Sequence, residues 1–150
     1  MSKLKEQLYI LCVNYVKNKE AEIRKIISDA QEAANDETKS SAGDKYETGR
    51  EVMQQEIDLN LVRLGELEKL KSTLDKIIPA QNNTTAQPGA LVRTNNGSYY
   101  ISISAGPLKI DNTSYYAISS ASPIGAKLIG LSAGNEFEFN GKKFVIETVA

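Results

Sequence analysis

Cys12 is the only thiol of this 150-residue chain, and the chain contains no histidine. A thiolate nucleophile is usually activated by a neighbouring base or cation, most often histidine. Without histidine, the common His/Cys zinc sites and the histidine-based acid–base and triad mechanisms are excluded. Cys12 lies beside Leu8, Leu11 and Tyr15 in a predicted helix, so we expect a small buried hydrophobic residue rather than a nucleophile.

The serine-rich run at 119–122 does not supply an alternative nucleophile. It reads Ser-Ser-Ala-Ser and lacks the Gly-x-Ser-x-Gly turn that presents a catalytic serine. No glycine-rich stretch matches a phosphate-binding loop either. The sequence therefore does not favour serine catalysis or nucleotide binding.

The composition is typical of a folded protein, with 41% hydrophobic and 25% charged residues. The formal net charge of −1 disfavours charge-driven binding to nucleic acid. No apolar run reaches the roughly 18 residues that a membrane-spanning helix needs, and the amphipathic N-terminal residues do not resemble a signal peptide. We expect a soluble cytoplasmic protein with no membrane partner.

The distribution of charge divides the chain near Pro79. Residues 1–78 carry 13 Lys/Arg and 15 Asp/Glu, whereas residues 79–150 carry only 5 and 4. The segment from Pro79 to Gly89 is polar, uncharged and without helical or strand periodicity, which indicates a linker. We therefore predict a first domain at 1–78, a linker at 79–89 and a second domain at 90–150.

Apolar residues in the first domain recur at steps of three and four, which is typical of helices with one buried stripe. Two such runs occur, and the second ends at Pro79, where a helix should stop. The polar segment 35–44 between them is rich in turn formers, so we predict an antiparallel coiled-coil hairpin. The expected buried positions are Leu4, Leu8, Leu11, Tyr15, Ile23, Ile26 and Ala30, followed by Met53, Ile57, Leu61, Leu64, Leu67, Leu70 or Lys71, Leu74 and Ile78.

The second domain consists of short runs of β-branched and aromatic residues, which predict strands at 90–94, 98–103, 108–110, 115–118, 136–139 and 143–149. The segments 95–97 and 140–142 contain Asn and Gly and predict hairpin turns. The segment 122–130 begins with Ser122 and Pro123 and ends at Gly130, which predicts a short helix packed on the sheet. The predicted fold class is α+β, a helical hairpin followed by a small sheet domain with one short helix.

Two stretches resemble a known family. The run Ser-Pro-Ile-Gly-Ala-Lys-Leu-Ile-Gly at 122–130, followed by Ala-Gly-Asn-Glu at 133–136, is similar to the C-terminal domain of the Gre transcript cleavage factors (GreA/GreB). Tyr46, Arg50 and Glu51 match the stretch that follows the hairpin turn in that family. Because the family also opens with a coiled-coil hairpin, the resemblance covers essentially the whole chain and implies an FKBP-like fold for residues 90–150.

The resemblance implies a bacterial transcription elongation factor that binds RNA polymerase and is not an enzyme by itself. In this family the C-terminal domain docks on the polymerase and the hairpin tip enters the secondary channel, where it helps the polymerase to cleave backtracked RNA. The nascent RNA 3′ end would be met only indirectly, and Mg²⁺ would be held only in the complex, with no cofactor in the isolated protein. The implied docking residues are Ser122, Pro123, Ile124, Gly125, Leu128, Ile129 and Gly130.

The predicted tip departs from the family pattern. Aligned on Tyr46, the metal-binding Asp and Glu of the family fall on Lys39 and Ala42, which cannot bind a cation. A shift of two or three residues would restore a carboxylate pair, since carboxylates suit hydrated Mg²⁺. The candidates for that pair are Asp36, Glu37 and Asp44. Two alternatives stay open: these acids only cap and solvate the helix ends, or the tip regulates the polymerase without supporting cleavage.

Three further residues have expected supporting roles near the tip. Tyr46 is expected to pack against the hairpin end, whereas Arg50 and Glu51 pair with neighbouring charges on the helix surface or with the polymerase. A peptidyl-prolyl isomerase is a third hypothesis, but packing in the sheet explains the aromatic residues of the second domain more simply. We expect a monomer.

Overall fold

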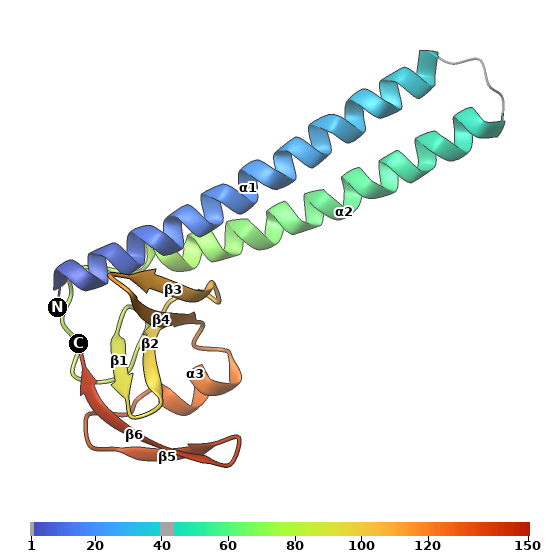
Figure 1. The fold of residues 1–150 in the computed structure, drawn as a ribbon. Helices are drawn as coiled ribbons and strands as arrows, with labels where there is room; N and C mark the ends of the chain where they lie inside the picture. The colour runs from blue at the N-terminus through green and yellow to red at the C-terminus, as the bar shows by residue number, and fades with distance from the viewer. Residues whose placement is uncertain (1, 40–43) are drawn as a thin grey trace. The chain divides into compact units, whose positions relative to one another are not determined.

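Two long helices open the chain, as the apolar repeats predicted. A computed structural model of the protein describes residues 2–39 and 44–150, including the side chains of 3–35 and 49–150. Helix α1 spans Ser2–Lys39 and helix α2 spans Asp44–Asp75, and they run antiparallel (Figure 1). Both helices extend into the polar segment at 35–44. None of the helices in the described residues is both long and apolar enough to cross a membrane.

The contacts within the chain define two compact units. Unit 1 comprises Met1–Tyr15 and Lys71–Ala150, and unit 2 comprises Val16–Leu70. Each is described separately below. The division into residues 1–78, 79–89 and 90–150 stays a prediction.

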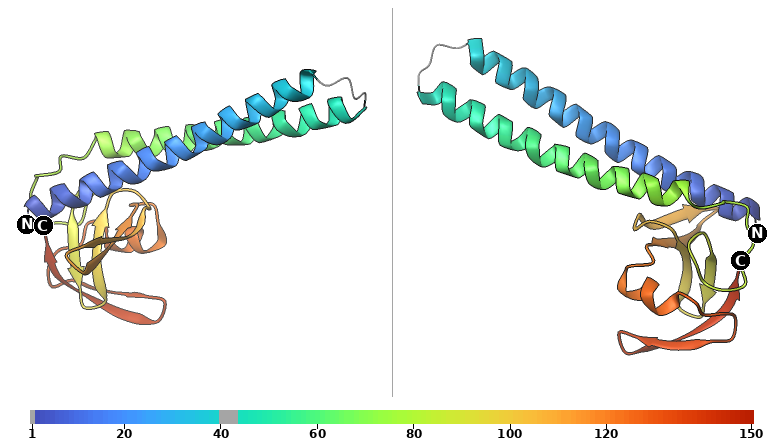
Figure 2. Two further views of the ribbon diagram at one scale, coloured as in Figure 1. Left: turned by 45° about the horizontal axis from the view of Figure 1, so that its top comes forward. Right: turned by 180° about the vertical axis from the view of Figure 1, so that it is seen from behind.

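Unit 2 is a two-helix hairpin with one apolar seam. In its part of the structure α1 and α2 lie side by side in both views of Figure 2. One amide also lies in the buried part of this unit, because Asn60 is only 1% exposed and its Nδ2 donates to the Glu56 carbonyl oxygen at 2.8 Å. The central seam residues are Ile27, Ala30 and Ile57, with Ile23, Met53 and Leu64 packed against them.

Unit 1 contains one mixed six-stranded sheet. The strands are β1 Leu91–Thr94, β2 Gly97–Ile101, β3 Gly106–Ile110, β4 Thr113–Ile118, β5 Glu136–Phe139 and β6 Lys142–Val149. Their order across the sheet is β3-β4-β2-β1-β6-β5, and only β2 and β4 pair in parallel. The two outer strands are therefore β3 and β5.

The predicted short helix is present as α3, Pro123–Leu128, and it packs on one face of the sheet. Leu128 is fully buried there, next to Ile101 of β2 and Ile146 of β6 in one apolar core. The predicted fold class, α+β with a long helical region followed by a sheet and one short helix, is confirmed.

The first turns of α1 belong to the core of unit 1. Leu8 and Cys12 are fully buried, and the Tyr9 hydroxyl donates to the carbonyl oxygen of Leu74 at 3.0 Å. The segment after α2 also packs in this unit, because Ala86 is 1% exposed and its N–H donates to the Leu131 carbonyl oxygen at 2.8 Å. Unit 1 is thus assembled from both ends of the chain.

Candidate functional site

The residues predicted at the hairpin tip fall partly outside the described structure. Asp36 and Glu37 lie in the α1 backbone, and Asp44 and Tyr46 lie in the α2 backbone, but their side chains are outside the described residues. The approach of the three carboxylates to one another therefore stays a prediction. Among the described side chains, no group of three His, Cys, Asp or Glu residues could hold a metal ion.

The described residues closest in sequence to the tip form an open hollow in unit 2. Its volume is about 390 Å³, and it lies between α1 and α2. Arg50 lines this hollow, whereas Glu51 is exposed and does not. The lining combines four polar with three apolar side chains and consists of Gln31, Ala34, Asn35, Arg50, Gln54, Ile57 and Leu61.

Sequence reasoning missed the amides of this hollow. Gln31 and Asn35 are one helical turn apart on α1, and Gln54 is one turn after Arg50 on α2, so the four-residue spacing could have identified them. The Gln54 Nε2 donates to Asp58 Oδ1 at 2.9 Å, which orients that amide. Amides and one guanidinium can hydrogen-bond to anionic or carbonyl oxygens.

The predicted docking segment of unit 1 is held by its own cap. The Ser122 Oγ donates to the Ser119 carbonyl oxygen at 2.7 Å and accepts from the Gly125 N–H at 3.1 Å. Pro123 occupies the first helical position, where its missing N–H has no consequence. The cap explains why these residue types occur here without reference to a partner.

The docking segment divides into buried and exposed residues. Gly125 and Leu128 are buried, and Ile124 is half-buried against the core. Pro123, Ile129 and Gly130 are exposed, and Ile129 is 39% exposed despite its apolar side chain. Any partner of this segment would therefore meet Pro123 and Ile129 rather than Leu128.

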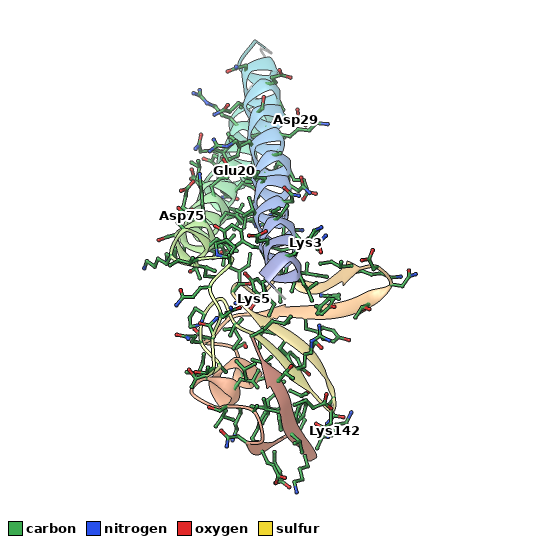
Figure 3. The ribbon with its side chains drawn as sticks, turned by 90° about the vertical axis from the view of Figure 1, so that its left-hand side faces the viewer. Lys3, Lys5, Glu20, Asp29, Asp75 and Lys142 are labelled. Atoms are coloured by element: carbon green, nitrogen blue, oxygen red, sulfur yellow. The ribbon has the colours of Figure 1, made fainter. Side chains whose placement is uncertain are left out.

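A buried polar cluster in unit 1 was not predicted. Lys5 is fully buried at the start of α1 (Figure 3), and its Nζ donates to the carbonyl oxygen of Gln81. Burial lowers the pKa of Lys5, because the charged ammonium loses water. The repeat 5-8-12-16 of buried positions on α1 places Lys5 in line with Leu8 and Cys12.

The prediction that Cys12 is a buried hydrophobic residue is confirmed. Cys12 is fully buried, and its Sγ lies 3.4 Å from the Ser102 Oγ. Burial raises the pKa of the Cys12 thiol, and the contact with Ser102 only partly opposes this effect. The neighbouring Tyr100 is also fully buried, its hydroxyl has no hydrogen-bond partner in the described part of the chain, and burial raises its pKa. These groups are not activated for chemistry at neutral pH.

The buried ammonium predicts a pH dependence of stability. Unfolding returns Lys5 to its ordinary pKa of 10.5, so between the lowered folded pKa and 10.5 the unfolded chain binds more protons. Stability conferred through Lys5 should therefore rise with pH in that window, by at most about 1.4 kcal/mol per pH unit. We expect the free energy of unfolding of the wild type, relative to Lys5→Met, to increase between pH 7 and pH 10 in urea titrations.

Folding raises the pKa values of Tyr9, Cys12 and Tyr100, so their ionisation lowers the free energy of unfolding as the pH rises above about 9. These three groups are present in both the wild type and Lys5→Met, so their contribution cancels in the difference between the two proteins. Lys3→Met is the matched control, because Lys3 lies on the same turn of α1 and is exposed. Parallel stability curves for wild type and Lys5→Met would contradict the buried charge.

Comparison with protein-family models, with curated proteins and with solved structures found no match to this chain. The architecture of the described residues is a helical hairpin and a mixed six-stranded sheet with one short helix.

Proposed function

We propose that this chain is an accessory factor of RNA polymerase of the Gre type, which acts through the polymerase and is not an enzyme by itself. The observation that carries the proposal is the paired seam of unit 2, in which Ile27 and Ala30 of α1 pack with Ile57 of α2. In such a hairpin the two packed helices would hold the acidic residues at their ends in fixed positions. The resemblance at residues 122–130 and at Tyr46, Arg50 and Glu51 supports the same assignment.

In this proposal the carboxylates of Asp36, Glu37 and Asp44 would hold a hydrated Mg²⁺ ion in the polymerase complex. Carboxylate oxygens fit this role, because Mg²⁺ prefers hard oxygen ligands and keeps most of its water. The metal would supply charge stabilisation for cleavage of the RNA phosphodiester. The chain itself would contribute the position of the carboxylates at the ends of α1 and α2.

A second candidate is a polymerase regulator that enters the same channel without supporting cleavage. Lys39 favours it, because this lysine is the last residue of α1 and stands where the family has its aspartate. A cation at this position would oppose metal binding.

Transcript cleavage by stalled, backtracked polymerase complexes distinguishes these candidates. If the first proposal is correct, the protein stimulates RNA shortening, and Asp36→Asn, Glu37→Gln or Asp44→Asn lowers the rate by about 10- to 100-fold. Asp29→Asn is the matched control, because Asp29 is an exposed carboxylate on α1, in a stretch with no predicted role (Figure 3). Binding without shortening supports the regulator, and no binding contradicts both.

The proposed docking surface can be tested separately. Ile129→Glu places a charge on an exposed apolar residue of the surface and should weaken polymerase binding about tenfold. Ile10→Glu is the control, since Ile10 is 55% exposed in the same unit but outside the docking segment. Equal binding of both variants would exclude the α3 segment as the docking surface.

A further inference from the structure

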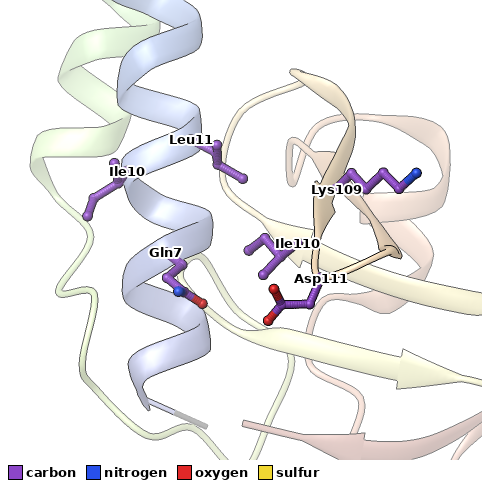
Figure 4. Close-up of a pocket in the computed structure, with 6 residues that line it drawn as sticks. All are labelled: Gln7, Ile10, Leu11, Lys109, Ile110 and Asp111. Atoms are coloured by element: carbon purple, nitrogen blue, oxygen red, sulfur yellow. The ribbon is translucent and has the colours of Figure 1, made fainter.

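The two outer strands of the sheet differ in how their edges are protected. On β3, Pro107 has no N–H to donate, and Lys109 places a charge on the edge. Helix α1 also faces this strand across a hollow of about 360 Å³ (Figure 4). Proline, lysine and a covering element are the usual means of preventing an edge strand from pairing. The hollow is lined by Gln7, Ile10, Leu11, Lys109, Ile110 and Asp111.

Strand β5 forms the opposite edge, and its charged residues are two glutamates rather than a lysine. It contains no proline, and its only strand partner in the described residues is β6, which leaves its other side free (Figure 1). The turn between β5 and β6 has positive φ at Asn140 (52°) and Gly141 (76°), which identifies a two-residue hairpin of type I′.

This turn determines which backbone groups are free. Residues flanking such a turn form a hydrogen-bonded pair, and pairs along an antiparallel ladder then alternate. The N–H of Ile146 donates to the Asn135 carbonyl oxygen at 2.9 Å, in agreement with this alternation. The backbone N–H and C=O groups of Glu136 and Glu138 therefore point away from β6, towards the free edge.

The side chains of β5 give the edge a definite chemistry. Glu136 and Glu138 are exposed on one face, whereas Phe137 and Phe139 are half-buried on the other. Glu136 forms an exposed ion pair with Lys143 at 3.0 Å, but Glu138 has no ion pair among the described residues. Phe137 is fixed by stacking on the ring of Phe144, with 4.9 Å between the ring centroids.

We propose that the β5 edge binds an extended segment of a partner protein by β-strand addition. The segment carries Lys or Arg at alternate positions, which lie beside Glu136 and Glu138, and apolar residues between them, which lie beside Phe137 and Phe139. A second copy of this chain is a poorer occupant, because pairing of two β5 strands brings glutamates next to glutamates. The proposal does not depend on the polymerase-directed function proposed above.

The test is an NMR titration of the full chain with blocked hexapeptides. The probe alternates lysine and valine, and the two control peptides are an alternating glutamate and valine hexamer and a block peptide of three lysines followed by three valines. We expect the alternating lysine peptide to bind at least about tenfold more tightly than the glutamate peptide, and to protect the amides of Glu136 and Glu138 from hydrogen exchange.

Charge reversal at the edge provides the variant. Glu138→Lys should weaken binding of the lysine peptide about fivefold or more, whereas Glu147→Lys, an exposed glutamate on the interior strand β6, should leave it unchanged. Equal binding of the block peptide, protection of other amides, or indifference to Glu138→Lys would overturn the proposal. So would a dimer in sedimentation that protects the β5 amides without peptide.

Discussion

Gly125→Ala is expected to lower the free energy of unfolding of unit 1 by about 3 kcal/mol. An added Cβ would lie 2.0 Å from the Ser119 carbonyl oxygen and 2.8 Å from the Ser122 Oγ. These two atoms are joined by a hydrogen bond, and the same Ser122 Oγ accepts from the Gly125 N–H to cap α3. The methyl group must therefore displace the cap, and Leu128 three residues later would leave its buried position.

Gly65→Ala is the matched control for this substitution. Gly65 lies within α2, and an added Cβ there meets no other atom within 4 Å. The same change should therefore stabilise the helix by about 1 kcal/mol through alanine's higher helix propensity. Urea unfolding followed by tyrosine fluorescence and helical circular dichroism measures both variants. Destabilisation by less than about 1 kcal/mol for Gly125→Ala would show that the cap accommodates the methyl group.

Leu8→Ala has the second large expected effect. Leu8 is fully buried, so truncation removes apolar burial and leaves a cavity, with an expected loss of about 3 kcal/mol. Ile10→Ala is the control, because Ile10 is only two residues further along the same helix but 55% exposed, and it should cost less than about 0.5 kcal/mol.

Leu8→Ala and Ile10→Ala also test whether the first turns of α1 belong to the core of unit 1. If the first turns of α1 are part of its core, Leu8→Ala should increase hydrogen exchange in β2, where Tyr100 and Ile101 are fully buried. An effect confined to the amides of α1 would contradict this assignment.

The sequence could predict the elements well because their signals are local. Six β-rich runs correspond to the six strands, and the serine cap with proline and glycine identified α3. The helix ends were less accurate. The helix predicted to end at Pro79 ends at Asp75, and polar residues expected to form the turn extend α1 to Lys39, because the first and last turns of a helix tolerate polar side chains.

Side-chain burial on the helices was only partly predictable. Ile26 and Leu61 were expected in the apolar stripe, but they are 36% and 52% exposed, while Ile27 and Asn60 are buried. Ile78 is likewise 64% exposed, and Ile77 is buried instead. Ile26 and Ile27 are adjacent apolar residues that fit the same 3.6-residue period almost equally well, and only tertiary packing chooses between them. Asn60 is polar, and Ile77 and Ile78 follow the end of α2 at Asp75, so helical periodicity could not identify these positions.

The candidate site was less predictable than the fold. Lys5 was not expected inside, because an unpaired lysine is rarely buried and its burial depends on a carbonyl group that is 76 residues away in the chain. The tip residues Asp36, Glu37 and Asp44 were proposed by resemblance, and their geometry depends on side chains that are not described. The Phe and Glu alternation of β5 was visible as a strand, but its position at an edge follows only from the strand order.

Unit 1 is formed by two segments that are far apart in the sequence, which affects how it folds during synthesis. Residues 16–70 leave the ribosome as one continuous segment and can form unit 2 early. Residues 1–15 can pack into unit 1 only after residues 71–150, which are translated last, have emerged. β1 pairs with β6, so the sheet too closes only when residue 149 has emerged. At roughly 5–20 residues per second, the apolar residues at the start of the nascent chain stay exposed for about 7 to 27 seconds, a period in which a chaperone would protect them.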